Sequence, residues 1–265
     1  MRFGLIVIGD EILSGRRQDG HLPFVVQRLA GRGQALAWAE FVADERPALT
    51  ETLARAFQRS RTGGDVVFCC GGIGSTPDDH TRQCAAAALG VPLVPHPEAV
   101  ALIDARIAQR CAEQGIPFDP DSPGQAVRRQ MGHFPQGAAI LPNPFNQIPG
   151  FSVGDVHFMP GFPVMAHPMM DGLLATRYAH LAPRDWAEHQ LYATRAFEAD
   201  LTPLMQRIEA DHPTVRVFSL PVVDKAHPRG PHVELGVKGP AADAALAFSA
   251  LRAGLDARAT PYQLD

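Results

Sequence analysis

The chain has 265 residues, of which 46% are hydrophobic and 20% are charged, and its formal net charge at pH 7 is −4. This composition is that of an ordinary globular protein, and its length suits one large domain or two modest ones. The weak negative charge argues against binding to nucleic acids or to a membrane surface, and no stretch reaches the roughly 20 apolar residues of a membrane span.

The first part of the chain alternates apolar runs with stretches of helical spacing. The runs at residues 3–8 and 65–70 are continuously apolar, which is typical of strands buried on both faces of a sheet, and residues 35–42 alternate like a strand. The predicted strands cover residues 3–8, 35–42 and 65–70, and the predicted helices cover residues 19–31 and a segment that opens at Pro47. This order predicts a three-layer α/β/α fold with a mostly parallel sheet.

The stretch GGIGSTPDDHT, residues 71–81, follows the third predicted strand. Its pattern places Thr76 as the N-cap of a helix, Pro77 in the first position and Asp79 in the third, and the helix runs to about Gly90. Backbone N–H groups of a glycine-rich loop before a helix attract anions. The stretch is therefore interpreted as a phosphate-binding loop that also carries two carboxylates.

The rest of the chain contains a second group of elements. We expect helices over residues 96–114 and near 123–131, short strands with turns over 138–160, and then a helix. Beyond an expected linker at residues 182–186, the pattern predicts strands at 189–197, 214–220 and 231–239 and helices at 198–210 and 240–255. This order is typical of a small α+β domain. The sequence thus predicts two domains, residues 1–180 and residues 185–265.

Carboxylates follow three of the predicted strands, at the sheet edge where open α/β sheets bind ligands. Each acid alone has a plain structural explanation, such as a helix cap or a turn. Together, carboxylates beside a glycine loop suit a divalent cation such as Mg²⁺, which is held by one or two carboxylates and by substrate phosphates. Asp44 and Asp79 are the main candidates for catalysis and for metal binding. The secondary metal candidates are Asp10, Glu11 and Asp78.

A second interpretation of the same loop needs no metal. The glycine amides would bind the anion, while Asp79 accepts a hydrogen bond from a sugar or a pterin-like ring. In either case the candidate ligand-binding residues are glycines and hydroxyl residues at the strand ends and in the turn MPGFP: Gly9, Ser14, Gly15, Gly71, Gly72, Gly74, Ser75, Thr76 and Gly161. Arg16 and Arg17 could also clamp an anion.

Several other kinds of site are not indicated. The eleven histidines show no H-E-x-x-H spacing, which argues against zinc, and the four cysteines show no C-x-x-C spacing and are interpreted as buried thiols. The sequence has neither a G-x-S-x-G elbow nor a P-loop. We expect no haem or flavin group. Acids follow the N-terminal apolar run at once, so we expect no signal peptide and a cytoplasmic location.

Five motifs in order carry a resemblance to a known family: IGDEILSG, VADERPALTETL, GGIGSTPDDHT, ILPNPFNQIPGF and MPGFPVMAHPM. Residues 1–175 resemble the MoaB/Mog-type molybdopterin-binding domain, in the version of the N-terminal region of the competence/damage-inducible protein CinA. The molybdopterin-like domain of some FAD synthases is similar. Residues 190–255 resemble the small α+β domain that follows in CinA-like proteins, and we do not expect the CinA C-terminal amidase domain.

The resemblance implies a homo-oligomer and a small phosphate-containing ligand. In molybdopterin-binding members, two aspartates at the positions of Asp44 and Asp79 serve adenylylation or metal handling, and the glycine loop holds the ligand. Some CinA-like members hydrolyse the pyrophosphate bond of ADP-ribose or related dinucleotides with a divalent metal. We therefore expect a pyrophosphatase that uses Mg²⁺, Mn²⁺ or Co²⁺. The alternatives are a non-catalytic molybdopterin or nucleotide binding module and an adenylyltransferase of molybdenum cofactor biosynthesis.

The chain departs from the family's usual pattern in three places. Ser75 stands where proline is common, and Asn146 and Gln147 stand where CinA-like sequences usually have Gly-Thr. Ile148 replaces an alanine, and the turn MPGFP is followed by VMAH without the usual Ser-Glu.

Overall fold

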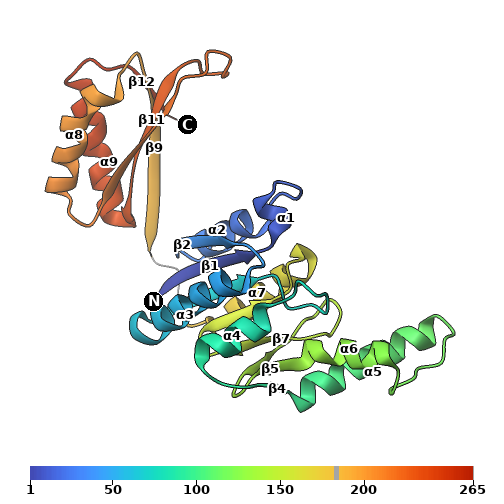
Figure 1. Ribbon diagram of the computed structural model, residues 1–265. Coiled ribbons are helices and arrows are strands. Elements are labelled where there is room, and N and C mark those ends of the chain that lie inside the picture. The colour runs from blue at the N-terminus through green and yellow to red at the C-terminus, as the bar shows by residue number, and fades with distance from the viewer. Residues whose placement is uncertain (182–184, 265) are drawn as a thin grey trace. The chain divides into compact units, whose positions relative to one another are not determined.

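The computed structural model describes residues 1–181 and 185–264, which divide into two compact units with the boundary after Leu181 (Figure 1). The first three residues of the expected linker at 182–186 lie outside the described residues. Its last residue, Trp186, is already the first residue of a strand. Among the described residues, no helix is both long and apolar enough to cross a membrane.

The first unit is a three-layer α/β/α fold, which confirms the predicted fold class. Its strands are β1 (Arg2–Ile8), β2 (Leu36–Val42), β3 (Asp65–Cys70), β4 (Leu93–Pro95), β5 (His133–Pro135), β6 (Ala139–Leu141), β7 (Gly150–Val153) and β8 (Val156–Met159). The main sheet has the order β2-β1-β3-β8-β7-β6, in which β2, β1, β3 and β8 are parallel, β7 runs antiparallel to β8, and β6 runs antiparallel to β7. The short strands β4 and β5, which the sequence pattern does not predict, form a separate pair.

The helices of the first unit match the predicted ones in most places. They are α1 (Asp10–Leu13), α2 (His21–Ala30), α3 (Arg46–Gly63), α4 (Thr81–Leu89), α5 (Pro97–Glu113), α6 (Pro123–Arg129), the 3₁₀ turn η1 (Gln130–Gly132) and α7 (Pro163–Ala175). The short helix α1, directly after β1, is not predicted by the sequence pattern.

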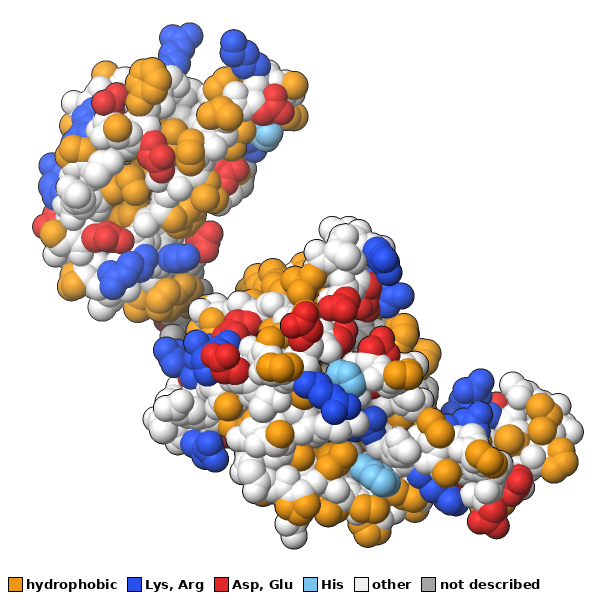
Figure 2. Space-filling view, viewed as in Figure 1, with side chains coloured by type: hydrophobic (Ala, Val, Ile, Leu, Met, Phe, Trp, Pro, Cys, Tyr) orange, Lys and Arg blue, Asp and Glu red, His pale blue; other side chains and the backbone are white. Residues whose placement is uncertain are grey.

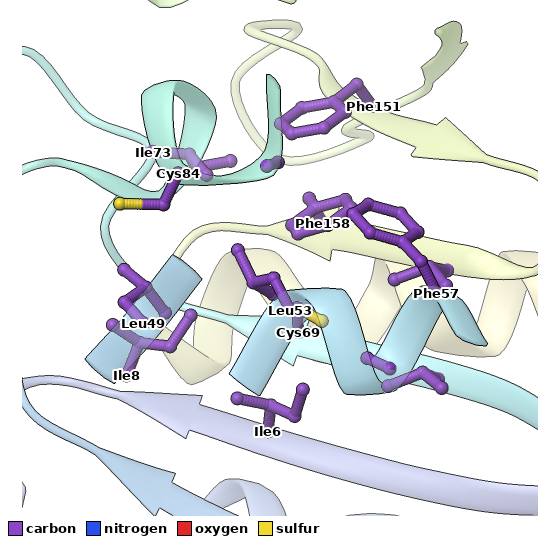
Figure 3. Close-up of a cluster of buried hydrophobic side chains, with 14 of the residues drawn as sticks. Ile6, Ile8, Leu49, Leu53, Phe57, Cys69, Ile73, Cys84, Phe151 and Phe158 are labelled. Carbon is purple, nitrogen blue, oxygen red and sulfur yellow. The ribbon is translucent and has the colours of Figure 1, made fainter. Parts of the chain in front are cut away.

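Two hydrophobic cores cover the two faces of the main sheet. Alternate residues of β1 enter different cores: Ile6 packs on the side of α3 and α4, and Leu5 packs on the side of α2 and α7. Figure 3 shows the first of these cores, in which the rings of Phe151 and Phe158 stack with their centroids 4.3 Å apart. Because both faces are buried, the inner strands are continuous apolar runs, as the sequence predicts.

The start of helix α4 corrects the sequence prediction. The helix begins at Thr81 and not after an N-cap at Thr76, and residues 71–80 form an extended loop. The carboxylate of Asp79 accepts hydrogen bonds from the backbone N–H groups of Gly74 and Thr76, at 2.9 and 2.7 Å. These local bonds give the backbone an alternative to the helix. The glycine loop is therefore longer than predicted, and Asp79 organises it.

The second unit is a four-stranded antiparallel sheet with two helices. Its elements are β9 (Trp186–Thr194), α8 (Glu198–Asp211), β10 (Arg216–Val222), β11 (His232–Pro240), α9 (Ala241–Asp256) and β12 (Tyr262–Leu264). The sheet order is β10-β11-β9-β12. The unit has its own core, in which Leu204 of α8 and Leu251 of α9 pack with Leu235 of β11. The strand-helix-strand-strand-helix order is as predicted, and β12 is an addition to it.

Candidate functional site

A pocket of about 380 Å³ lies at the carboxyl ends of β1, β2, β3 and β8. This is the edge of a parallel sheet at which ligands bind in open α/β folds. Each of the four strands is followed by a loop that contributes to the pocket wall. The lining residues are Ile8, Gly9, Glu11, Arg17, Asp44, Gly71, Gly72, Ile73, Gly74, Ser75, Thr76, Asp78, Asp79, Met131, Asn143, Asn146, Ile148, Pro149, Pro160, Gly161, Phe162 and Met165.

The structure brings most of the predicted site residues together in this pocket. Those that line it are Gly9, Glu11, Asp44, Gly71, Gly72, Gly74, Ser75, Thr76, Asp78, Asp79 and Gly161. Ser14 and Gly15 are exposed, at the end of α1, and do not line the pocket formed by the described residues. Arg17 lines the pocket wall, and Arg16 does not. The binding and catalytic roles of these residues remain predictions.

The glycine loop packs tightly against the ends of the neighbouring strands. Gly71 has a φ of 118°, and a Cβ atom there would lie 2.1 Å from the carbonyl oxygen of Ile8. A side chain at Gly161 would meet the Cα atom of Gly71 at 3.3 Å. Only glycine at position 71 lets the loop after β3 pass so close to β1. The turn after β8 therefore lies directly against the loop.

A buried arginine of helix α4 holds the glycine loop in place. The Arg82 guanidinium donates from Nη2 to the carbonyl oxygen of Gly74 at 2.5 Å, and the residue is 3% exposed. Burial lowers the pKa of Arg82 to about 10, although nearby Asp79 opposes this. The loop is thus fixed at Gly74 by two charged groups, Arg82 at its carbonyl and Asp79 at its N–H.

A second group of acids lies at the ends of β1 and β2. Asp10 and Asp44 exchange hydrogen bonds: the Asp10 N–H donates to Asp44 Oδ2 at 3.1 Å, and the Asp44 N–H donates to Asp10 Oδ1 at 3.2 Å. Burial raises the pKa of Asp44, and the nearby charges of Asp10, Glu11 and Asp78 raise it further, against the effect of the Asp10 N–H. The site therefore concentrates negative charge before any ligand is bound, and Figure 2 shows acidic side chains gathered on the first unit near α1.

The described part of the chain holds no group of three or more His, Cys, Asp or Glu side chains placed to hold a metal ion. The carboxylates of the pocket wall that could contribute to such a site are Glu11, Asp44, Asp78 and Asp79, and both oxygens of Asp79 already accept hydrogen bonds within the loop. Carboxylate oxygens suit hard cations such as Mg²⁺. Because Mg²⁺ is commonly held by only one or two carboxylates together with substrate phosphates, these donors are compatible with such a cation, and a metal role for them stays a prediction.

A buried histidine positions the turn after β8. His21, at the start of α2, contacts the carbonyl oxygen of Gly161 through Nε2 at 3.1 Å. Because a carbonyl oxygen only accepts, Nε2 carries the proton. Burial lowers the pKa of His21, which favours the neutral ring. The sequence pattern does not indicate this role for His21, because the contact joins residues 140 positions apart.

Another part of the pocket wall is not among the ligand-binding residues predicted from the sequence. It comes from the loop between β6 and β7 and from the start of α7, and its residues are Asn143, Asn146, Ile148, Pro149, Phe162 and Met165. The chain contains no asparagine other than Asn143 and Asn146. This pairing, in a segment that departs from the usual family pattern, was the available signal.

Fold and pocket together define a ligand-binding α/β domain of a known family. The family described as "Probable molybdopterin binding domain" matches residues 4–180, so the chain belongs to it. The predicted resemblance to the CinA version of this domain is also confirmed.

Two of the relatives are named CinA-like proteins. One from Anaeromyxobacter dehalogenans (strain 2CP-1 / ATCC BAA-258) is 35% identical over 172 residues, which covers 62% of this chain and 38% of that protein. Another, from Anaeromyxobacter sp. (strain Fw109-5), is 30% identical over 250 residues and covers 91% of this chain and 55% of that protein. The chain thus matches only 38% to 55% of the length of these two relatives.

Among solved structures, the chain is similar to the crystal structure of the protein CinA, of unknown function, from Thermoplasma acidophilum. The TM-score is 0.53 at 24% identity, and the match covers 69% of this chain and 99% of that one. At this identity, the likeness shows the fold of the first unit.

Proposed function

We propose that the first unit binds a phosphate-containing pterin or nucleotide and hydrolyses its phosphoanhydride bond with the help of a divalent cation. The observation that carries the proposal is that the glycine loop and the carboxylate of Asp44 line one pocket at the sheet edge. Backbone N–H groups suit an anion, and the acids suit a cation that neutralises them. The description of the family as a probable molybdopterin binding domain supports a pterin-type ligand.

The residues of the pocket have distinct parts in this proposal. The amides of Gly71, Gly72 and Gly74 bind phosphate oxygens, and Asp79 keeps that loop in shape. Asp44 would hold the cation with a contribution from Asp79. When bound, the cation would polarise a phosphate and make it more open to attack by water. Arg17, at the pocket wall, adds positive charge for a second phosphate.

A non-catalytic binding module is the second candidate. It is favoured by the bonds that Asp79 already makes, since both of its oxygens accept hydrogen bonds inside the loop. In that case the acids orient a ligand without chemistry. An adenylyltransferase of molybdenum cofactor biosynthesis is a further candidate, and it would use the same anion site.

A homo-oligomer and a cytoplasmic location are also part of the proposal. Light scattering tests the oligomeric state, and cell fractionation tests the location.

The test is turnover of ADP-ribose and FAD by the purified chain with Mg²⁺, Mn²⁺ or Co²⁺, followed by chromatography of the products. We expect AMP to be released, and Asp44→Asn to lower the rate by at least about 100-fold. Asp121→Asn is the matched control, because Asp121 is exposed and does not line the pocket. Asp79→Asn alone decides less, because it also disturbs the loop. Ligand-induced stabilisation without turnover for any metal would favour the binding module.

A further inference from the structure

The amide group of Asn146 has a fixed orientation in the pocket wall. Its Oδ1 accepts hydrogen bonds from Asn143 Nδ2 at 2.8 Å and from the Ile148 N–H at 3.0 Å. Two donors facing one atom identify that atom as the oxygen. The amide nitrogen must therefore be on the other side, where it lies 3.6 Å from the thioether sulfur of Met165.

The partner that fixes this orientation is itself immobilised. Asn143 is 4% exposed, and its Nδ2 also donates to the carbonyl oxygen of Ile148 at 3.0 Å. Its Oδ1 accepts from the Phe145 N–H at 3.1 Å. These hydrogen bonds link Asn143 to Phe145, Asn146 and Ile148. Asn143 therefore serves to position Asn146.

The Nδ2 group of Asn146 keeps unused donor capacity. A primary amide nitrogen has two N–H groups, and the contact with Met165 uses one of them on a weak sulfur acceptor. Both residues line the pocket. The pocket wall therefore offers an N–H group that can donate a hydrogen bond to a ligand atom with a lone pair.

The surface around this donor is apolar and partly aromatic. Ile148 and Met165 line the pocket beside Asn146, and Phe162, at the end of the turn that follows β8, is 53% exposed. The guanidinium carbon of Arg17 lies 5.7 Å from the centre of the Phe162 ring. Apolar walls with a small number of placed polar groups are typical of sites for flat organic rings, and an exposed aromatic side chain offers a stacking face.

We propose that this wall is a subsite for a planar heteroaromatic ring, and that Asn146 determines specificity by donating a hydrogen bond from Nδ2 to a ring nitrogen or carbonyl oxygen at the edge of that ring. Phe162, Ile148 and Met165 provide the apolar surfaces. Purines and pterins share this chemistry. The inference rests on the proposed function, because the ring is held in addition to the phosphate that the glycine loop binds.

The test compares ligands with and without a ring, using calorimetric titration of the whole chain. AMP, neopterin monophosphate and the ring-free ribose 5-phosphate contain no phosphoanhydride, so turnover does not interfere. Asn146→Asp keeps the oxygen that accepts from Asn143 and Ile148 and removes the N–H donor. Gln147→Glu adds the same charge at the next position, where the side chain is exposed and does not line the pocket. Thermal melting checks that both variants remain folded.

We expect AMP or neopterin monophosphate to bind more tightly than ribose 5-phosphate, and the tighter of the two identifies the ring. Asn146→Asp also adds a negative charge to the pocket wall, which weakens every phosphate ligand, so the ring ligand should lose about tenfold more affinity than ribose 5-phosphate, the usual value of one hydrogen bond. All affinities of Gln147→Glu should stay within about twofold of the wild-type values.

Two outcomes overturn the inference in distinguishable ways. If ribose 5-phosphate binds as tightly as both ring compounds, or if Asn146→Asp weakens all ligands alike, the ring subsite is wrong and the phosphate site stands. If the wild-type chain binds none of the phosphate compounds, the proposed function fails, and the ring subsite fails with it.

Discussion

At the scale of single residues, the two aspartates predicted to act together are in different situations. Asp79 accepts hydrogen bonds from Gly74 and Thr76 and is part of the loop structure. Asp44 accepts from the Asp10 N–H, and its pKa is raised first by burial and then by the charges of neighbouring acids. Asp44 is therefore the carboxylate whose charge is poorly compensated in the unliganded protein. A bound cation would therefore stabilise the charge of Asp44 more than the charge of Asp79.

Replacing Asp44 by asparagine should stabilise the unliganded fold at neutral pH. A carboxyl group whose pKa is raised in the folded state disfavours folding above that pKa, where it is charged. Below the pKa of the unfolded chain the group is neutral in both states, and the effect disappears. We expect Asp44→Asn to raise the melting temperature by about 2 °C at pH 7 and to leave it unchanged near pH 3.

The measurement is thermal melting of both proteins at the two pH values, with and without MgCl₂. Magnesium with AMP should stabilise the wild-type chain more than Asp44→Asn, because the cation loses one of its carboxylates. A lower melting temperature of Asp44→Asn at pH 7 would show that the hydrogen bonds with Asp10 matter more than the charge.

At the scale of secondary structure, the sequence could predict the features that arise from local pattern. The strands β1 and β3 are continuous apolar runs because both of their faces are buried, and this pattern is visible in the sequence. The predicted start of α4 was wrong because the Asp79 side chain accepts a hydrogen bond from the Gly74 N–H instead of from the N–H groups of a helix N-terminus. The strands β4, β5 and β12 are three residues long and exist through pairing with distant segments, so they leave little local signal.

The candidate site shows the same difference between features of local sequence pattern and features that depend on tertiary contacts. Its glycine and acidic residues stand in recognisable positions at strand ends, and the sheet edge brings them together. The part of the pocket wall around Asn143 and Asn146 is marked in the sequence only by its departure from the family pattern. The environment of Asn146 could not be predicted, because it depends on Met165, which comes from another element 19 residues later. The same holds for His21, whose partner Gly161 is 140 residues away. Tertiary contacts of this kind have no periodicity in the sequence.

A buried polar chain links β7, β8 and the segment after α7. The Tyr178 hydroxyl donates to Asp155 Oδ1 at 2.7 Å, so its oxygen can accept from His157 Nε2 at 2.6 Å. The other ring nitrogen of His157, Nδ1, then accepts from the Ser152 hydroxyl at 2.7 Å. This order keeps the imidazole neutral. Burial, with a contribution from Arg177, lowers the pKa of His157 to about 3.

The low pKa of His157 in this hydrogen-bonded network predicts that the first unit loses stability in acid. Between the usual histidine pKa of about 6.5 and the folded value, the unfolded chain binds a proton that the folded chain does not bind. The free energy of unfolding should fall by at most about 1.4 kcal/mol for each pH unit below 6.5 from this residue alone. Urea titrations at pH 7 and pH 5, followed by fluorescence of Trp38 in a Trp186→Phe background, measure the difference.

A variant separates the polar chain from other titrating groups. Tyr178→Phe removes the acceptor of the His157 proton and should destabilise the first unit by about 1 to 3 kcal/mol at pH 7. The acid loss should persist in this variant, because burial keeps the pKa of His157 low and removing the acceptor of its proton does not make the ring easier to protonate. His157→Gln removes the titrating ring, and an unchanged difference in stability between pH 7 and pH 5 in that variant would exclude His157 as a source of the acid sensitivity.

At the scale of the whole molecule, each unit has a complete hydrophobic core of its own. The residues of the two cores of the first unit end before position 182, and the core of the second unit begins after it. Domains with separate cores can fold independently. The chain also carries one tryptophan in each unit, Trp38 and Trp186, so the state of each unit can be followed separately.

We therefore expect two thermal transitions, of which only one responds to a phosphate ligand. The pocket lies within residues 8–165, so AMP with Mg²⁺ at about 100 times its Kd should raise the Trp38 transition by about 5 to 10 °C. The Trp186 transition should stay within about 1 °C, because its unit contributes no residue to the pocket wall formed by the described residues. The measurement is thermal melting of Trp38→Phe and Trp186→Phe, each with one remaining tryptophan. A single transition that both tryptophans report, shifted equally by AMP, would mean that the two units unfold cooperatively despite their separate cores.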